Sequence, residues 1–266
     1  MALWRTAYAS VIGTSHLQSG TCCQDAGACR VVRATDGREV LIGVVSDGAG
    51  SAKRSEKGSG LAVSGFIEKF SPLVECDPEL KCLHRGLVED WLSDFRLQLS
   101  VLAQEEGTAL REFACTFLAA IAGPESAICI QIGDGAIVGS AEEAGDYSWL
   151  TWPQHGEFAN TTNFVTDEDA LITMQFEIIS KQFNEIALFS DGLERLILDM
   201  QSHSVHSPAL RPIFLWLAKT NPAFGRSEPE PALETFLSSR RINERTDDDK
   251  TLVMGTRVVP GQTDFS

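Results

Sequence analysis

The chain has 266 residues, 43% of them hydrophobic, and a formal net charge of −15 at neutral pH. The hydrophobic fraction argues against a disordered chain, and the negative charge argues against the basic surface that non-specific nucleic-acid binding needs. No apolar run approaches the roughly 20 residues needed to span a bilayer, and the first 13 residues lack the features of a secretory signal. We therefore expect a soluble, cytoplasmic protein that forms one domain over residues 1–266, with no nucleic-acid or membrane partner.

Seven cysteines are scattered along the chain without a C-x-x-C pair. That spacing does not match a structural zinc site or a compact disulfide framework. We expect free thiols in a reducing compartment.

The residue pattern predicts the following elements in chain order. A buried strand at 40–46 precedes helices at 55–70 and 80–104, the second with an apolar residue at every third or fourth position. Strands at 113–122, 126–132 and 136–139 are separated by Gly/Pro or Gly/Asp turns, as in hairpins. Further strands are expected at 149–152, 164–166, 170–179, 185–189 and 251–259, and helices at 193–198, 209–219 and 231–243.

Strands come in runs and helices come in pairs along this order, unlike the strict alternation of a parallel doubly wound sheet. The pattern favours the α+β class. We predict a four-layer α-β-β-α sandwich, in which two antiparallel sheets are flanked by helix pairs.

Acidic residues abut apolar strands at several places. Asp47 and Asp191 each follow a strand, Asp248 belongs to an acidic run before the last strand, and Asp134 gives a weaker fourth case. Any one of them is readily explained as a turn or cap residue. Several such carboxylates at the ends of neighbouring strands of one sheet would repel one another unless cations lay between them. Oxygen ligands without His or Cys favour Mg²⁺ or Mn²⁺ over zinc.

Six motifs occur in the order and approximate spacing of the protein phosphatase 2C family, from about residue 10 to residue 258. The chain resembles its short bacterial branch, in which Gly-x-Ser-His precedes the first motif, as residues 13–16 do here. The six are Cys22-Cys23-Gln24-Asp25-Ala26, Asp47-Gly48-Ala49-Gly50, Ala114-Cys115-Thr116, Gly133-Asp134-Gly135, Ser190-Asp191-Gly192-Leu193 and Asp248-Asp249-Lys250-Thr251.

The resemblance implies a role for each matching residue. Asp47 would bridge two metal ions, and the Gly48 carbonyl would bind one of them. Asp191 and Asp248 would complete the shell of the other ion, partly through water. Asp25 would orient metal-bound water, so that Asp47, Asp191 and Asp25 form the catalytic set. Asp134 would lie near a third metal ion, which the family sometimes carries.

Four departures from the family pattern affect the expected site. No Arg lies shortly before Asp25, where the family usually has one that grips the substrate phosphate, and His16 is the candidate replacement, with a turn or packing role as the alternative. Gln24 replaces a Glu that often helps to hold metal, and Arg195 replaces an Asp associated with the third ion. Ala49 stands where many relatives have a His that acts as general acid, so water is the expected proton donor.

The resemblance implies a protein Ser/Thr phosphatase that uses water activated at a binuclear Mg²⁺ or Mn²⁺ centre. The implied partner is a phosphorylated protein, such as a Ser/Thr kinase or its target. Two alternatives stay open at this point. One is a pseudophosphatase that binds a partner without turnover, motivated by the missing Arg and by Gln24. The other is a phosphatase that acts on a small phosphorylated metabolite.

Overall fold

A computed structural model of the chain describes residues 2–142, 145–154, 162–220 and 230–259. Within these residues the strands pair into two five-stranded antiparallel sheets and one small hairpin. The first sheet has the order β1-β12-β9-β6-β7, with bounds Leu3–Val11, Lys250–Val258, Glu185–Phe189, Ala136–Ser140 and Ser148–Thr151. The second has the order β2-β3-β4-β5-β8, with bounds Ala26–Arg33, Glu39–Ser46, Phe117–Ala122, Ala127–Ile132 and Gln175–Ile179. The hairpin joins β10 (Leu198–Asp199) to β11 (Ser204–Val205).

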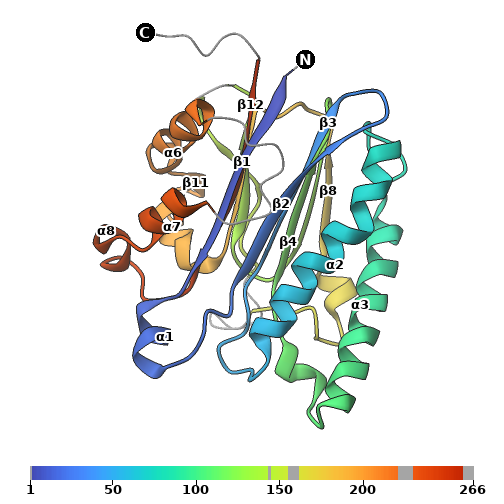
Figure 1. Cartoon of the computed structure of the whole chain (residues 1–266), viewed down its shortest axis with the longest axis vertical. Helices are drawn as coiled ribbons and strands as arrows, with labels where there is room; N and C mark the ends of the chain where they lie inside the picture. The colour runs from blue at the N-terminus through green and yellow to red at the C-terminus, as the bar shows by residue number, and fades with distance from the viewer. Residues whose placement is uncertain (1, 143–144, 155–161, 221–229, 260–266) are drawn as a thin grey trace.

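The helices lie on the outer faces of the two sheets (Figure 1). Helices α2 (Ser55–Cys76) and α3 (Arg85–Glu105) cover the second sheet, and their Phe66 and Trp91 pack on Phe117 of β4. The first sheet is covered by α5 (Glu194–Ile197), α6 (Ser207–Lys219) and α7 (Pro231–Leu237). The other short helices are α1 (Thr14–Ser19), α4 (Ala170–Thr173), α8 (Arg240–Asn243) and the 3-10 turns η1 (Leu110–Phe113) and η2 (Asp191–Leu193).

A hydrophobic cluster between the two sheets joins them to each other. Trp4, Leu188 and Val253 of the first sheet and Leu41 and Leu118 of the second belong to one buried cluster. Burial on both faces explains why β3, β4, β5, β6 and β9 are predominantly apolar and buried at every position. The predicted α+β class with two antiparallel sheets and flanking helices is confirmed.

Most of the predicted elements are present, and the exceptions have local causes. Residues 164–166 form a turn, because the Asp167 carboxylate accepts a hydrogen bond from the Phe164 N–H at 2.7 Å, as in a capped turn. The first part of 170–179 is helical as α4, and only Gln175–Ile179 is a strand. The predicted helix 231–243 is broken after α7, where the Ser238 hydroxyl bonds the Glu234 carbonyl at 2.6 Å.

Two long strands, β1 and β2, were not predicted. β1 alternates irregularly between buried and half-buried positions, and β2 is an edge strand with charged side chains, so neither shows a clean period of two. No helix of the described chain is long and apolar enough to cross a membrane.

Close contact between α2 and η1 predicts opposite effects for two glycines of the same helix. A Cβ on Gly58 would lie 2.2 Å from the Phe113 carbonyl oxygen, whereas one on Gly65 would meet nothing within 4 Å. Gly58→Ala should lower the free energy of unfolding by about 1–3 kcal/mol through overpacking. Gly65→Ala should raise it by about 0.5–1 kcal/mol, because alanine loses less backbone entropy in a helix. Urea unfolding of both variants checks the pair, and equal effects would contradict the close contact.

Candidate active site

The predicted site residues lie at one edge of the two packed sheets. Asp25 precedes β2 and Asp47 follows β3, and the pairing of Ala26 with Ser46 brings the two together. Asp191 follows β9 and Asp134 precedes β6, whose Ala136 pairs with Phe189. Because the strands are antiparallel, alternate starts and ends meet at this edge. The carboxylates therefore come from both sheets, and not from one sheet as the sequence argument assumed.

A cavity of about 410 Å³ opens at this edge. Five carboxylate residues and one histidine are the titratable groups among its described lining. Gly48, Ala49 and Gly50 of the loop after β3 also line it, with Ser15, Thr116, Thr162 and Phe164. The acidic and basic residues are His16, Asp47, Asp134, Asp191, Asp247 and Asp248.

Burial and mutual repulsion raise the pKa values of the carboxyl groups in this region. Burial raises the pKa of Asp47 well above the usual carboxyl range, and the charges of Asp25 and Asp191 add to the rise. Burial also raises the pKa of Asp191 to about 6, and Asp134 and Asp248 contribute. The metal-free site therefore holds protons more tightly than separate, exposed carboxylates would.

Asp25 lies behind the cavity lining in a buried hydrogen-bond network. The Ser190 hydroxyl donates to Asp25 Oδ2 at 2.7 Å and accepts from the Thr251 N–H at 3.0 Å. Burial raises the pKa of Asp25 to about 7, and the bond from Ser190 opposes this rise. The other carboxylate oxygen of Asp25, Oδ1, is buried with no protein partner.

The loop after β3 is fixed by the strand beside it. Thr116 donates its backbone N–H to the Asp47 carbonyl at 2.8 Å, and its side-chain oxygen accepts from the Asp47 N–H at 2.9 Å. Next in the loop, a Cβ on Gly48 would lie 2.7 Å from the Gln24 carbonyl oxygen and 2.8 Å from Ser55 Cβ. No side chain fits there, so the backbone of Gly48 can line the cavity directly.

The donor set fits a hard divalent cation. Asp25 Oδ1, Asp191 Oδ1 and Gln24 Oε1 are buried oxygen atoms without a protein hydrogen-bond partner. A cation, directly or through water, would satisfy such oxygens and offset both the burial and the mutual repulsion that raise the pKa values of the carboxyl groups. In the described part of the chain, no group of three or more His, Cys, Asp or Glu side chains is arranged so that these side chains alone could hold a metal ion. Mg²⁺ is normally held by one or two carboxylates with several waters, so an open site of this kind suits it.

Asp134 faces the same cavity and is held from two sides. Thr162 donates its hydroxyl to Asp134 Oδ2 at 2.6 Å. The turn that carries Asp134 is fixed by Glu194, whose carboxylate accepts from the Gly135 N–H at 2.8 Å. Burial raises the pKa of Glu194 to about 7.

Asp248 is exposed and also lines the cavity. Its Oδ1 accepts a hydrogen bond from the Asp249 N–H at 2.9 Å, and its backbone carbonyl accepts one from the buried Lys250 ammonium at 3.0 Å. Burial lowers the pKa of Lys250. The turn that presents Asp248 is thus fixed by its two neighbours in the sequence.

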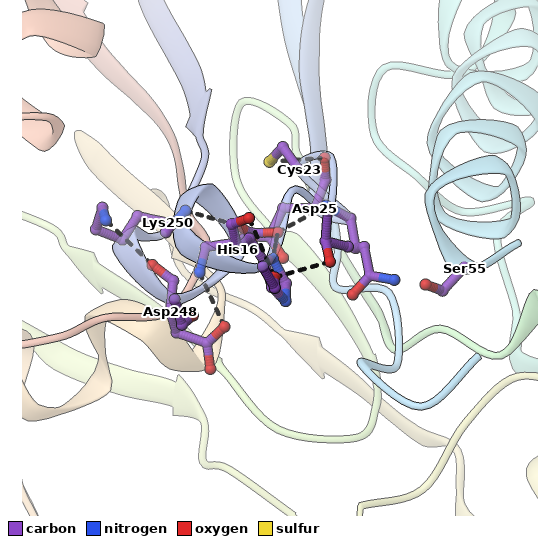
Figure 2. A network of polar contacts seen from close by, with 12 residues as sticks. His16, Cys23, Asp25, Ser55, Asp248 and Lys250 are labelled. Atoms are coloured by element: carbon purple, nitrogen blue, oxygen red, sulfur yellow. Dashed lines mark hydrogen bonds and ion pairs between the residues drawn. The ribbon is translucent and has the colours of Figure 1, made fainter. Parts of the chain in front are cut away.

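His16 lies between the Asp248 turn and the segment that carries Cys23 and Asp25 (Figure 2). Its Nδ1 is 2.9 Å from Oδ2 of Asp249, and the imidazole lines the cavity. His16 is distant in the sequence from the predicted metal ligands, yet it lines the same cavity as Asp47 and Asp191. Gln24 lies beneath the loop after β3, where its Nε2 donates to the Ala52 carbonyl at 3.3 Å.

Sequence reasoning missed the parts played by Asp249, Thr116, Glu194 and Thr162. Asp249 stands where the family motif has Asn, and in a run of three Asp residues nothing marks which carboxylate turns inward. Thr116 and Ser190 lie within two of the six motifs, but the motif pattern alone does not predict what their hydroxyl groups bind. Glu194 and Thr162 have no local signal, because their partners are 59 and 28 residues away.

Comparison with known proteins identifies close relatives of the whole chain. Residues 12–238 match the family model described as protein phosphatase 2C. The chain is 39% identical over 251 residues to Serine/threonine-protein phosphatase 3 of Escherichia coli (strain K12), which covers 94% of this chain and 97% of that protein.

Solved structures share the fold at much lower sequence identity. The serine/threonine phosphatase Stp1 of Staphylococcus aureus superposes with a TM-score of 0.61 at 15% identity, covering 96% of this chain and 95% of that one. A bacterial serine phosphatase superposes with the same TM-score and identity, covering 94% of this chain and 96% of the other.

The raised pKa values predict an inverted pH dependence of stability for the metal-free protein. A carboxyl group titrates near 3.9 in the unfolded chain, whereas Asp191 and Asp25 titrate at about 6 and about 7 in the fold. The folded state therefore holds more protons between these values, and stability falls as the pH rises through roughly 4 to 7. We expect the metal-free protein to melt at a higher temperature at pH 5 than at pH 8.

Addition of Mn²⁺ or Mg²⁺ at pH 8 should restore the lost melting temperature, because a cation replaces the protons. Asp191→Asn, which removes one carboxylate, should show a smaller difference between the two pH values. About 1 kcal/mol shifts the melting temperature of a domain of this size by roughly 2–4 °C, so calorimetry resolves the effect. Equal melting temperatures of the metal-free wild type at pH 5 and pH 8 would contradict the electrostatics of the site.

Proposed function

Because the chain belongs to the protein phosphatase 2C family, we propose that it is a metal-dependent phosphatase of phosphoserine and phosphothreonine in proteins. The observation that carries this function is the convergence of Asp47, Asp134, Asp191 and Asp248 on one cavity with unsatisfied buried oxygens beside it. The family resemblance drawn from the motifs is confirmed by the family match and by the relative in Escherichia coli.

The proposed cofactors are two Mg²⁺ or Mn²⁺ ions, with a third near Asp134. Asp47 and the Gly48 carbonyl would hold one ion, and Asp191 and Asp248, with Asp47, the other. When bound, the ions supply an activated water as nucleophile and neutralise charge on the phosphoryl oxygens. Oxygen donors from carboxylate and backbone groups support these metals over zinc.

The other site residues would orient water, fix the Asp47 backbone and contact the substrate phosphate. Asp25, fixed by Ser190, would set the direction of water at the inner wall of the cavity through its Oδ1. Thr116 fixes the backbone on both sides of the Asp47 carboxylate. His16 would contact the substrate phosphate in the role that Arg usually has in the family. Ala49 offers no proton, so water remains the proposed donor to the departing serine or threonine oxygen.

The proposed substrate is a phosphorylated protein, such as a Ser/Thr kinase or its target. The cavity is partly open rather than closed over, as the partly exposed Asp47, Asp134 and Asp191 side chains indicate, which suits a phosphate carried on a large molecule. We also propose that the chain acts as one domain in the cytoplasm. Packing of both sheets into one shared cluster supports the first point, and seven free cysteines suit a reducing compartment.

Metal-dependent turnover and its loss in one variant test this function. Wild type should hydrolyse both p-nitrophenyl phosphate and a phosphothreonine peptide with Mn²⁺ or Mg²⁺, and neither with excess chelator. Asp191→Asn should lower kcat/KM by on the order of 100-fold or more, because an amide binds a divalent ion far less well than a carboxylate. Asp94→Asn, on the exposed face of α3, is the charge-matched control and should retain activity.

The alternatives give different results in the same assay. A protein that binds metal but hydrolyses no phosphopeptide or aryl phosphate would be a pseudophosphatase. Turnover of small phosphorylated metabolites much faster than of any phosphopeptide would make it a metabolite phosphatase. Absence of metal binding would overturn the proposed site altogether.

A further inference from the structure

Three aromatic side chains contact one another at the outermost strand of the first sheet. Trp149 of β7 and Trp152, which follows β7, meet edge to face with ring centroids 6.0 Å apart. His203, in the turn between β10 and β11, stacks on Trp152 at 4.0 Å and meets Trp149 edge to face at 5.9 Å. We call these three side chains the aromatic surface. It joins the small hairpin to β7.

The aromatic surface keeps much of its area in contact with solvent. Trp149 is 44% exposed, and His203 is exposed as well, whereas Trp152 is half-buried on the core beneath. His203 has a φ of 54°, a left-handed conformation that is uncommon outside glycine and is concentrated at functional sites. Joining the hairpin to β7 accounts for the stack of His203 on Trp152, but it does not account for the open indole of Trp149. Contiguous exposed apolar groups of this kind are typical of an interaction site.

The aromatic surface is continuous with the active-site cavity through the turn that carries Asp134. The side-chain nitrogen of buried Gln131 donates to the Gly133 carbonyl at 2.9 Å and to the Gly135 carbonyl at 3.1 Å. The same nitrogen lies 3.2 Å from the carbonyl oxygen of Trp152. One buried side chain therefore holds the backbone of Trp152 beside both neighbours of Asp134, which lines the cavity.

The separation of the aromatic surface from the cavity suits a short length of polypeptide. Val138 of β6 is the register partner of Trp149, and Asp134 lies four residues before Val138. At about 3.3 Å per extended residue, Trp149 is roughly 13 Å along the sheet from Asp134. A substrate chain in extended conformation covers that length in about four residues. A side chain close to the phosphorylated residue in sequence can therefore reach the rings while the phosphate lies in the cavity.

The surroundings of the rings favour an apolar side chain over a charged one. Indole rings attract cations as well as apolar groups, but a bound cation would gain most from a free carboxylate beside the rings. The acidic residue of the hairpin, Asp199, already accepts the N–H groups of Gln201 and Ser202 through its Oδ1, at 2.9 and 3.2 Å. The same hairpin presents Met200, which is 43% exposed, and His203 itself becomes a cation when protonated.

We propose that the aromatic surface is a docking subsite for a large apolar side chain of the phosphorylated protein substrate, about three to five residues from the residue that carries the phosphate. The proposal rests on the proposed function, to which it adds a preference for substrate sequence. A leucine side chain laid against Trp149 and His203 would leave water without taking part in the reaction. Contacts of this kind lower KM for the substrate and leave kcat unchanged.

Kinetics with matched peptides test the subsite. The substrates are p-nitrophenyl phosphate and phosphothreonine peptides that differ only in having Leu, Arg or Ser at the third, fourth or fifth residue on either side of the phosphothreonine. The proteins are wild type, Trp149→Ala and His203→Gly. Glycine accommodates the positive φ at this position, so His203→Gly removes the ring without adding strain. The control is Leu97→Ala, which truncates an exposed apolar side chain of α3, the helix that covers the other sheet.

We expect wild type to have a KM roughly fivefold or more lower for a Leu peptide than for its Ser counterpart, as partial burial of a leucine side chain implies. Trp149→Ala and His203→Gly should remove most of this preference. Both should keep kcat/KM for p-nitrophenyl phosphate within about twofold of wild type, because this substrate is too small to reach the rings. Leu97→Ala should behave as wild type on every substrate.

The same measurements separate failure of the subsite from failure of the proposed function. Turnover of the Ser peptides by wild type without any preference for Leu would overturn the inference alone. A preference for Arg that the two variants abolish would also overturn it, since the subsite would then bind a cation. Equal losses on p-nitrophenyl phosphate and on the Leu peptides would give the rings a structural role and overturn it too. If wild type turns over no substrate, the proposed function fails and the inference fails with it.

A measurement on wild type keeps the inference testable if the variants do not fold. The probes are the Leu and Ser peptides with a non-hydrolysable phosphonate in place of the phosphate, added to the protein with Mg²⁺. The indole N–H resonances of Trp149 and Trp152, identified by their loss in Trp149→Phe and Trp152→Phe, should shift with the Leu peptide and much less with the Ser peptide. Unchanged indole resonances at saturating Leu peptide would overturn the inference.

Discussion

The repulsion among buried carboxylates is the constraint on which the rest of this structure depends. Asp25, Asp47 and Asp191 are brought together from two sheets, and burial disfavours the charged form of each. The fold maintains this arrangement because the strands that present the carboxylates are predominantly apolar and buried at every position, which provides a rigid and closely packed frame. The same repulsion that is unfavourable in the metal-free fold would favour binding of a cation at this edge.

Close approach of backbone segments is what allows so many functional groups to meet at that edge. Gly13, Gly48 and Gly192 each lie against a neighbouring carbonyl at distances that exclude a Cβ. None of these three has a positive φ, so their glycine requirement comes from packing and not from backbone conformation. In the pairs Asp47-Gly48 and Asp191-Gly192, the glycine therefore lets one loop of the site pack against another.

The sequence predicted the two antiparallel sheets, and it predicted that Asp residues beside the strands would meet, because both features leave local signals. Buried strands such as 185–189 are short, mostly apolar runs with an Asp within two residues of their end, and the register of antiparallel strands then brings those Asp residues to one edge. Contacts between distant segments leave no such signal. The bond from Thr162 to Asp134 and the one from Gln24 to Asp249 depend on the finished packing. The same holds for the turn at 164–166, where one carboxylate outweighs a weak strand preference.

The three consecutive acidic residues at 247–249 make different contacts because they point in different directions. Asp247 uses its backbone carbonyl to hold α1, Asp248 faces the cavity, and Asp249 turns inward to the buried N–H groups of Gly13 and Gln24. Lys250, buried behind them, bonds the Asp248 carbonyl and places a positive charge beside the inward carboxylate. The inward carboxylate of Asp249 accepts the buried N–H groups of Gly13 and Gln24 and lies 2.9 Å from His16 Nδ1, so one side chain holds three segments of the chain together.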